Sequence, residues 1–222
     1  MRQFITLSLT KSSHMNSKQD HWENIYKTRD HKQLGWYQNV PQISLTLLSQ
    51  IKAKPSQSII DVGCGASTLV DHLIELAYRD IVLVDLSNET LLAIKNRLGE
   101  HGDTPTYLCE DITQASFTKA FDIWHDRAVF HFLTEDKDRT NYMTTLNSNL
   151  SSAGRAIIGT FSLNGPTTCS GLPIVQYDEE KMRIELAKAG LELIDSVTDI
   201  HTMPNGSNQE YLYFIIKHKH SN

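Results

Sequence analysis

Short apolar runs alternate along the chain with longer stretches in which apolar residues recur every three or four positions. The short runs are typical of buried strands, and the longer spacing is typical of helices. Strands are expected at 58–62, 80–87, 106–112, 120–126 and 154–162, followed by a hairpin of 191–203 and 210–219 around the turn PNGSNQ. Helices are expected at 21–28, 40–52, 68–77, 88–99, 138–150 and 178–190.

Strands that alternate with helices predict an α/β fold in which a mainly parallel sheet is covered on both faces. The final hairpin adds an antiparallel strand. With 222 residues, 40% of them hydrophobic, the chain is long enough for one full core and too short for two ordinary ones. We expect a flexible tail over 1–19 and a single domain over 20–222. The tail has no acid before Asp20, so an organelle targeting segment remains an alternative. A start at Met15 is a further alternative.

Composition narrows the classes of function. A net charge of −5 argues against a general nucleic-acid binder, and no apolar run approaches the ~20 residues that a membrane span needs. Cys64, Cys109 and Cys169 include no CxxC pair, which argues against a zinc site and a disulfide framework. No paired-histidine motif points to a metal. We therefore expect a cytoplasmic protein without a metal. The oligomeric state is left open.

A glycine turn directly follows the first expected strand. Gly63 and Gly65 lack a Cβ atom, so a ligand can approach the backbone, and the next helix offers unpaired N–H groups at its start. Ligands bind at this edge of open α/β sheets. A tight turn without any ligand is the alternative interpretation.

Acidic residues stand close to three consecutive strand ends. Asp85 ends the second strand, twenty positions beyond Gly65, where a carboxylate can accept hydrogen bonds from both hydroxyls of a ribose. Asp111, at the end of the third, can accept from the amine of adenine while Ile112 packs on the base. Each acid can instead cap a helix or face solvent. Together they favour an adenosine-containing ligand.

The ligand is then a dinucleotide or S-adenosylmethionine. A dinucleotide fingerprint has a third glycine, but Thr68 occupies that position. Asp61, just before the turn, would repel a pyrophosphate and suits the ammonium group of a methionine moiety. S-adenosylmethionine is therefore favoured. An NAD-binding oxidoreductase and a non-catalytic sensor of S-adenosylmethionine remain alternatives.

These motifs resemble those of the class I S-adenosylmethionine-dependent methyltransferases over roughly 20–218. DVGCG, LVDLS and CEDI resemble the first three motifs of that family, and FDIWHD stands at its fourth strand. The resemblance implies a Rossmann-like seven-stranded sheet whose last strand is antiparallel. It also implies a set of cofactor-binding residues, namely Asp61, Gly63, Cys64, Gly65, Asp85, Leu86, Asp111 and Ile112. The form GCGAS is similar to the branch that methylates lysines of elongation factor 1A and citrate synthase.

The candidate catalytic residues follow the fourth strand. Asp126 is expected to orient or deprotonate an acceptor, and His125 to contact the cofactor or act as a base. The alternative is an ion pair of Asp126 with Arg127 and a merely packed His125. The following RAVFHF differs from the lysine-methylating branch, so a small-molecule acceptor and a protein lysine both stay open. Nucleic acid ranks third, because no base-flipping loop or basic stripe is present.

Aromatic residues near the N-terminus are candidates for a lid. Trp36 and Tyr37 follow a glycine, and aromatic rings can seat a sulfonium by cation–π attraction. Trp22 and Tyr26 are expected in the core. The loop 163–173, after the fifth strand, is expected on the acceptor side.

Overall fold

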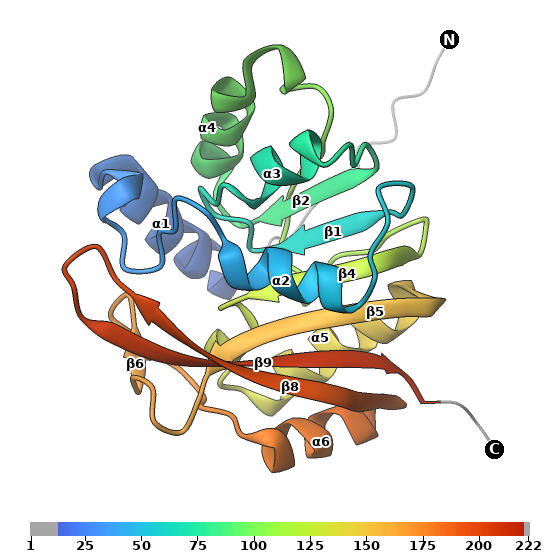
Figure 1. Ribbon diagram of the computed structural model, residues 1–222. Coiled ribbons are helices and arrows are strands. Elements are labelled where there is room, and N and C mark those ends of the chain that lie inside the picture. Colours follow the sequence, from blue (N-terminus) through green and yellow to red (C-terminus); the bar gives the residue numbers. More distant parts are fainter. Residues whose placement is uncertain (1–12, 220–222) are drawn as a thin grey trace, which may run out of the picture.

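Seven strands form one mixed sheet in the computed structural model, which describes residues 13–219 (Figure 1). Their order is β3-β2-β1-β4-β5-β9-β8. The strands are β1 (Ile59–Val62), β2 (Ile81–Asp85), β3 (Thr106–Cys109), β4 (Phe121–Arg127), β5 (Leu150–Phe161), β8 (Leu191–Thr202) and β9 (Asn208–His218). β9 is antiparallel to β5 and β8, whereas the other pairings are parallel. The predicted fold class is confirmed.

Helices cover both faces of this sheet. The helices are α1 (Ser13–Thr28), α2 (Gln42–Gln50), α3 (Leu69–Glu75), α4 (Asn88–Leu98), α5 (Asp136–Asn149) and α6 (Glu179–Lys188), with short 3-10 turns η1 (His31–Gln33), η2 (Gly99–His101) and η3 (Phe130–Phe132). Leu47 of α2, Leu73 of α3 and Ile94 of α4 belong to the apolar cluster on one face. α5 and α6 contribute to the cluster on the other face through Tyr142 and Leu186. Burial on both faces explains why every residue of β1 and β2 is buried and why all of them except Asp61 and Asp85 are apolar.

Local signals set several element boundaries. The Ser87 hydroxyl accepts from the Thr90 N–H at 3.3 Å and so caps α4, which ends at Gly99 with φ +57°. Asp178 caps α6 in the same way by accepting from the Lys181 N–H at 2.8 Å. The predicted start and end of the helix after the second strand are thereby confirmed.

The structure differs from the sequence-based expectation at the N-terminus. Residues 13–19, predicted as part of a tail, belong to α1, while 1–12 and 220–222 lie outside the described residues. Tertiary contacts hold this polar helix: Glu23 accepts from the Asn88 N–H of α4 at 2.8 Å, and Lys18 pairs with Asp138 of α5 at 2.8 Å. In Figure 1 α1 lies at the edge of the sheet near the start of α4.

Two smaller differences concern β5 and the loop after it. β5 starts at Leu150, directly after α5 ends, whereas the sequence predicted 154. Within 163–173, β6 (Thr168–Cys169) and β7 (Leu172–Pro173) pair as a separate hairpin. Within residues 13–219, no helix is both long and apolar enough to cross a membrane.

The strand order positions the site. β2 and β3 lie on one side of β1, and β4 and β5 lie on the other. The order in which successive strands are added to the sheet therefore reverses between β1 and β4. Val62, at the end of β1, is level with Val84 in β2 and with Asp126 in β4. A crevice for a ligand is expected at this point, beyond the carboxyl ends of the strands.

Candidate functional site

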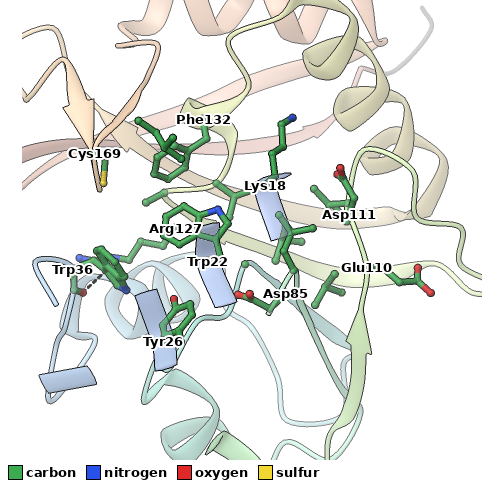
Figure 2. Close-up of a pocket in the computed structure, with 18 of the residues that line it drawn as sticks. Lys18, Trp22, Tyr26, Trp36, Asp85, Glu110, Asp111, Arg127, Phe132 and Cys169 are labelled. Carbon is green, nitrogen blue, oxygen red and sulfur yellow. Dashed lines mark hydrogen bonds between the residues drawn. The ribbon is translucent and has the colours of Figure 1, made fainter. Parts of the chain in front are cut away.

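A cavity of about 270 Å³ lies at the carboxyl ends of β1, β2, β3 and β4. Figure 2 shows most of its lining residues. Six of the ten predicted cofactor residues line this main cavity: Trp36, Gly63, Asp85, Leu86, Asp111 and Ile112. Sequence reasoning missed other lining residues, notably Lys18, Glu110, Arg127, Ala128, Val129 and Thr134.

A second cavity of about 50 Å³ adjoins the first and shares Trp36, Gly63 and Arg127 with it. The other four predicted cofactor residues line it: Tyr37, Asp61, Cys64 and Gly65. Its volume holds a few water molecules or a small polar group, but not a nucleoside. The ten residues are therefore brought together around two connected spaces.

Both glycines of the turn after β1 have a positive φ. Gly63 has φ +60° and Gly65 has φ +51°, a conformation that favours glycine. A Cβ atom on Gly65 would lie 2.6 Å from Tyr26 Oη, since α1 closes over the turn. The Cys64 N–H donates to the Val84 carbonyl at 3.1 Å, which ties the turn to β2.

Asp85 is the buried carboxylate between the turn and α4. One of its oxygens accepts from the Gly65 N–H at 2.9 Å, and the other from the Ser87 N–H at 2.8 Å. Each carboxylate oxygen can accept a further hydrogen bond. Burial raises the pKa of Asp85 to about 6, although the two backbone donors oppose that shift. Donors from a bound ligand would stabilise its charged form.

We predict that affinity for S-adenosylhomocysteine falls as the pH drops through 6. Only the ionised carboxylate offers both oxygens as acceptors, and with a pKa of about 6 roughly one-eleventh is ionised at pH 5, which weakens binding about tenfold. The contribution of Asp85 to the stability of the free protein changes with pH in the opposite direction to the affinity. Because the folded-state pKa is raised, the Asp85 contribution is present below about pH 4 and lost by about pH 6.

Calorimetric titration with S-adenosylhomocysteine between pH 5 and pH 8 measures the first trend. The matched control is Asp85→Asn, which cannot titrate and should bind weakly with a flat profile. An unchanged pH dependence in Asp85→Asn would assign the trend to another group.

Asp111 lies in the loop two residues beyond β3, because that strand ends at Cys109 rather than at the acid. One of its oxygens accepts from both the N–H and the hydroxyl of Thr113, at 2.9 and 2.8 Å. Ile112 is buried and lines the main cavity next to Asp111. We call Asp85, Leu86, Glu110, Asp111 and Ile112 the nucleoside end of the cavity.

His125 and Asp61 form a buried pair on the wall of the second cavity. His125 Nδ1 lies 2.7 Å from Asp61 Oδ1, and its Nε2 lies 2.9 Å from the hydroxyl of Ser44 in α2. All three side chains are buried. His125 therefore orients Asp61 and lies behind the turn rather than in the main cavity, so its predicted role as a base stays a prediction without geometric support.

Asp126 is fully buried and lines neither cavity. Its carboxylate accepts from the N–H groups of Val129 and Phe130 at 2.8 and 3.1 Å, and from the Tyr142 hydroxyl at 2.6 Å. Burial raises its pKa to about 6. These contacts give Asp126 a structural role in holding the turn after β4. Its predicted catalytic role stays a prediction that this placement does not support.

Four aromatic rings line the main cavity. Trp22 contacts Trp36 and Phe132 edge to face, with centroid distances of 5.9 and 5.2 Å, and Tyr26 lies 6.4 Å from Trp36. The prediction that Tyr26 lies in the core is confirmed, since it belongs to a small buried apolar cluster against which Trp22 packs, and both rings also line the main cavity. Their spacing of four residues sets both on one face of α1, but that spacing does not distinguish a core from a cavity wall.

The opposite end of the main cavity combines apolar side chains with one cation. Its lining residues are Arg127, Phe132, Thr134, Cys169, Leu172 and Pro173, which we call the acceptor end. Burial raises the pKa of the Cys169 thiol, so it stays protonated near neutral pH. In Figure 2 Glu110 and Asp111 lie on one side of the cavity, and Trp36 and Cys169 on the other.

Comparisons with known proteins agree with this geometry. A family described as a methyltransferase domain matches residues 59–154. The eEF1A lysine and N-terminal methyltransferase of Bos taurus is 29% identical over 151 residues, which cover 67% of this chain. That match spans 21% of the relative, so the chain covers about a fifth of the length of such relatives.

Solved structures show the same fold. An S-adenosylmethionine-dependent methyltransferase from Anabaena variabilis superposes with a TM-score of 0.72 at 13% identity, covering 98% of this chain and 100% of that one. A 1,6-didemethyltoxoflavin N1-methyltransferase from Burkholderia thailandensis, with bound 1,6-didemethyltoxoflavin and S-adenosylhomocysteine, gives 0.67 at 15% identity and covers 97% of this chain and 94% of that one.

The residues at the strand ends fit S-adenosylmethionine. Asp85 is a buried carboxylate with acceptor capacity left in the cavity, and Gly63 and Gly65 leave the backbone open where a Cβ would intrude. Asp61 offers a carboxylate in the small polar space next to the turn. Residues 59–154 thus match a methyltransferase domain, and the fold is the one seen in S-adenosylmethionine-dependent methyltransferases of known structure.

Proposed function

We propose that this protein transfers a methyl group to a small-molecule acceptor bound at the acceptor end of the main cavity. The observation that carries this choice is the lining of that end. Among the described residues it has apolar side chains, the Thr134 hydroxyl, the Cys169 thiol and one cation, Arg127, but no carboxylate. A lysine ammonium would meet no carboxylate there to attract it or to accept its proton.

Different residues of the chain would bind different parts of S-adenosylmethionine. Asp85 would accept from the ribose hydroxyls, Asp111 and Ile112 would hold the adenine, and Asp61 would attract the ammonium group. S-adenosylmethionine supplies an already activated methyl group. The protein therefore mainly positions the acceptor and excludes water, for which Trp22, Trp36 and Phe132 form a closed aromatic wall.

A protein acceptor is the second candidate, because the curated relatives are named as eEF1A lysine and N-terminal methyltransferases. The structural neighbour from Burkholderia thailandensis is named for a small-molecule acceptor. The lining of the acceptor end favours the small molecule. We further propose a cytoplasmic location, which the absence of paired cysteine motifs supports.

The proposal is tested by methyl transfer into cell extract. The protein is incubated with S-adenosylmethionine carrying a radiolabelled methyl group, and the extract is then separated by size. We expect label in the small-molecule fraction and S-adenosylhomocysteine release that depends on extract. Asp85→Ala, which should not bind the cofactor, serves as the negative control.

Each other outcome has a defined meaning. Label in the protein fraction would overturn the choice of acceptor and favour a protein lysine or N-terminus. Binding of S-adenosylhomocysteine without turnover in any extract would favour a sensor. Binding of NADH but not of S-adenosylhomocysteine would contradict the cofactor assignment itself.

A further inference from the structure

Arg127, at the end of β4, holds its guanidinium group at the boundary of the two cavities. Nη1 donates to the Trp36 carbonyl at 2.8 Å, and Nε donates to the Tyr213 hydroxyl at 3.1 Å. The group lies 5.0 Å from the ring centroid of Tyr211. Three contacts thus fix the head of the side chain in one orientation.

The remaining nitrogen of this group has no partner. Nη2 of Arg127 is buried, and no hydrogen-bond acceptor lies within reach among residues 13–219. None of the ion pairs in the described part of the chain includes Arg127. Buried charges are normally paired and buried N–H groups are normally bonded, since leaving them alone costs free energy.

The charge of Arg127 acts on its buried neighbours. The pKa of His131 is lowered to about 3 by burial first and by the Arg127 charge second. The pKa of His201 is lowered by the same two causes in the same order. Tyr213, Tyr211 and Asp199 favour the charged form of Arg127 against its burial, so its pKa is raised and it is a cation at neutral pH.

The position of this cation relates it to the acceptor. Arg127 borders the acceptor end beside Phe132 and Cys169, whereas Glu110 and Asp111 lie on the far side of the cavity (Figure 2). One free nitrogen and one positive charge suit a monoanion with an exposed oxygen. A phosphate dianion would require more donors.

We propose that the methyl acceptor carries a carboxylate group, which pairs with the free Nη2 of Arg127. This inference rests on the proposed function and adds the chemical class of the substrate. Arg127 then selects and orients the acceptor through its charge, and the aromatic wall of Trp22, Trp36 and Phe132 encloses the rest of it. A neutral or cationic acceptor would leave the buried guanidinium unpaired.

The competing partner for Nη2 is the carboxylate of the cofactor's own amino-acid end. Arg127 also borders the second cavity, in which Asp61 can hold the ammonium group of that end. A ligand that lacks the amino-acid end separates the two possibilities. 5′-Methylthioadenosine keeps the adenine, ribose and sulfur of S-adenosylhomocysteine but has neither carboxylate nor ammonium.

The first experiment determines the charge of the acceptor without knowing its identity. Extract freed of protein is passed over an anion exchanger at pH 8, and methyl-accepting activity is measured in the flow-through and in the salt eluate. We expect the activity in the eluate. Activity in the flow-through overturns the proposal, whereas no activity in the unfractionated small-molecule extract contradicts the proposed function instead.

The second experiment tests Arg127 itself. Binding of benzoate and of its neutral analogue benzamide is measured by tryptophan fluorescence in protein saturated with S-adenosylhomocysteine. We expect wild type to prefer benzoate at least tenfold, Arg127→Met to lose the preference, and Arg127→Lys to keep part of it. Arg139→Met is the matched control, since Arg139 lines neither cavity and pairs with Glu185 at 3.3 Å.

Cofactor affinity completes the test. We expect Arg127→Met to bind both S-adenosylhomocysteine and 5′-methylthioadenosine within threefold of wild type. A loss above tenfold for S-adenosylhomocysteine alone would assign Arg127 to the cofactor carboxylate and overturn the proposal. If Arg127→Met fails to fold, equal binding of benzoate and benzamide to wild type would still overturn it.

Discussion

Replacing Asp85 by alanine is expected to abolish binding of S-adenosylhomocysteine while the protein stays folded. The carboxylate is the buried acceptor that faces the ribose position, and each hydrogen bond to a charged group contributes about 1.5–3 kcal/mol. Losing two such bonds weakens binding by about two to four orders of magnitude. Isothermal titration calorimetry measures the loss, and thermal unfolding reports on the fold.

Two further variants separate binding from structure. Asp85→Ala also leaves the Gly65 and Ser87 N–H groups without their acceptor, whereas Asp85→Asn keeps the shape and one carbonyl oxygen. Glu110→Ala removes an exposed acid from the same end of the cavity and should bind within threefold of wild type. If Asp85→Ala bound as tightly as Glu110→Ala does, the ribose role of Asp85 would be refuted.

The nucleoside end was predictable from sequence because its signals are local. A buried strand leads straight into Gly63 and Gly65, and the other acids stand at or near the ends of the next two strands. Parallel strands with helical connections bring such ends to one edge of a sheet. Spacing and residue type were therefore enough to predict that Asp85 and Asp111 line the same cavity.

The acceptor end was not predictable, because it depends on where one strand stops. The hydrophobic pattern predicted that the fourth strand ends at Asp126, whereas β4 continues to Arg127. Neighbouring side chains of a strand point to opposite faces. Asp126 consequently faces Tyr142 of α5, and Arg127 faces Trp36 and Tyr213. Arg127 therefore lines the main cavity, whereas Asp126, the predicted base, does not.

Contacts across long sequence separations account for the rest. His125 is bonded to Asp61 and Ser44, which are 64 and 81 positions away. α1 is a polar helix whose position is fixed by α4 and α5 rather than by its own sequence pattern. Propensity and periodicity carry no information about such pairs. Only the structure shows that Lys18 and Trp22 line the main cavity and that His125 pairs with Asp61.

Replacing Gly63 by alanine is expected to destabilise the protein strongly and to eliminate cofactor binding. A Cβ atom at Gly63 would lie 2.0 Å from Val129 Cγ2, in a residue with φ +60°. The left-handed conformation alone costs about 1–2 kcal/mol for a residue other than glycine. Relieving the clash must in addition move the turn or Val129, both of which line the main cavity. Chemical denaturation and calorimetric titration with S-adenosylhomocysteine measure the two effects.

Gly190→Ala isolates the backbone contribution, since Gly190 has φ +71° and no atom within 4 Å of an added Cβ. It should lower the free energy of unfolding by about 1–2 kcal/mol and leave cofactor binding intact. Adding Val129→Ala to Gly63→Ala removes the Cγ2 atom that clashes and should restore most of the excess loss of stability. If Gly63→Ala were no less stable than Gly190→Ala and bound cofactor normally, the close approach of Val129 to the turn would not constrain the site. If the double variant regained stability without binding, the open backbone at Gly63 would be required for the ligand itself.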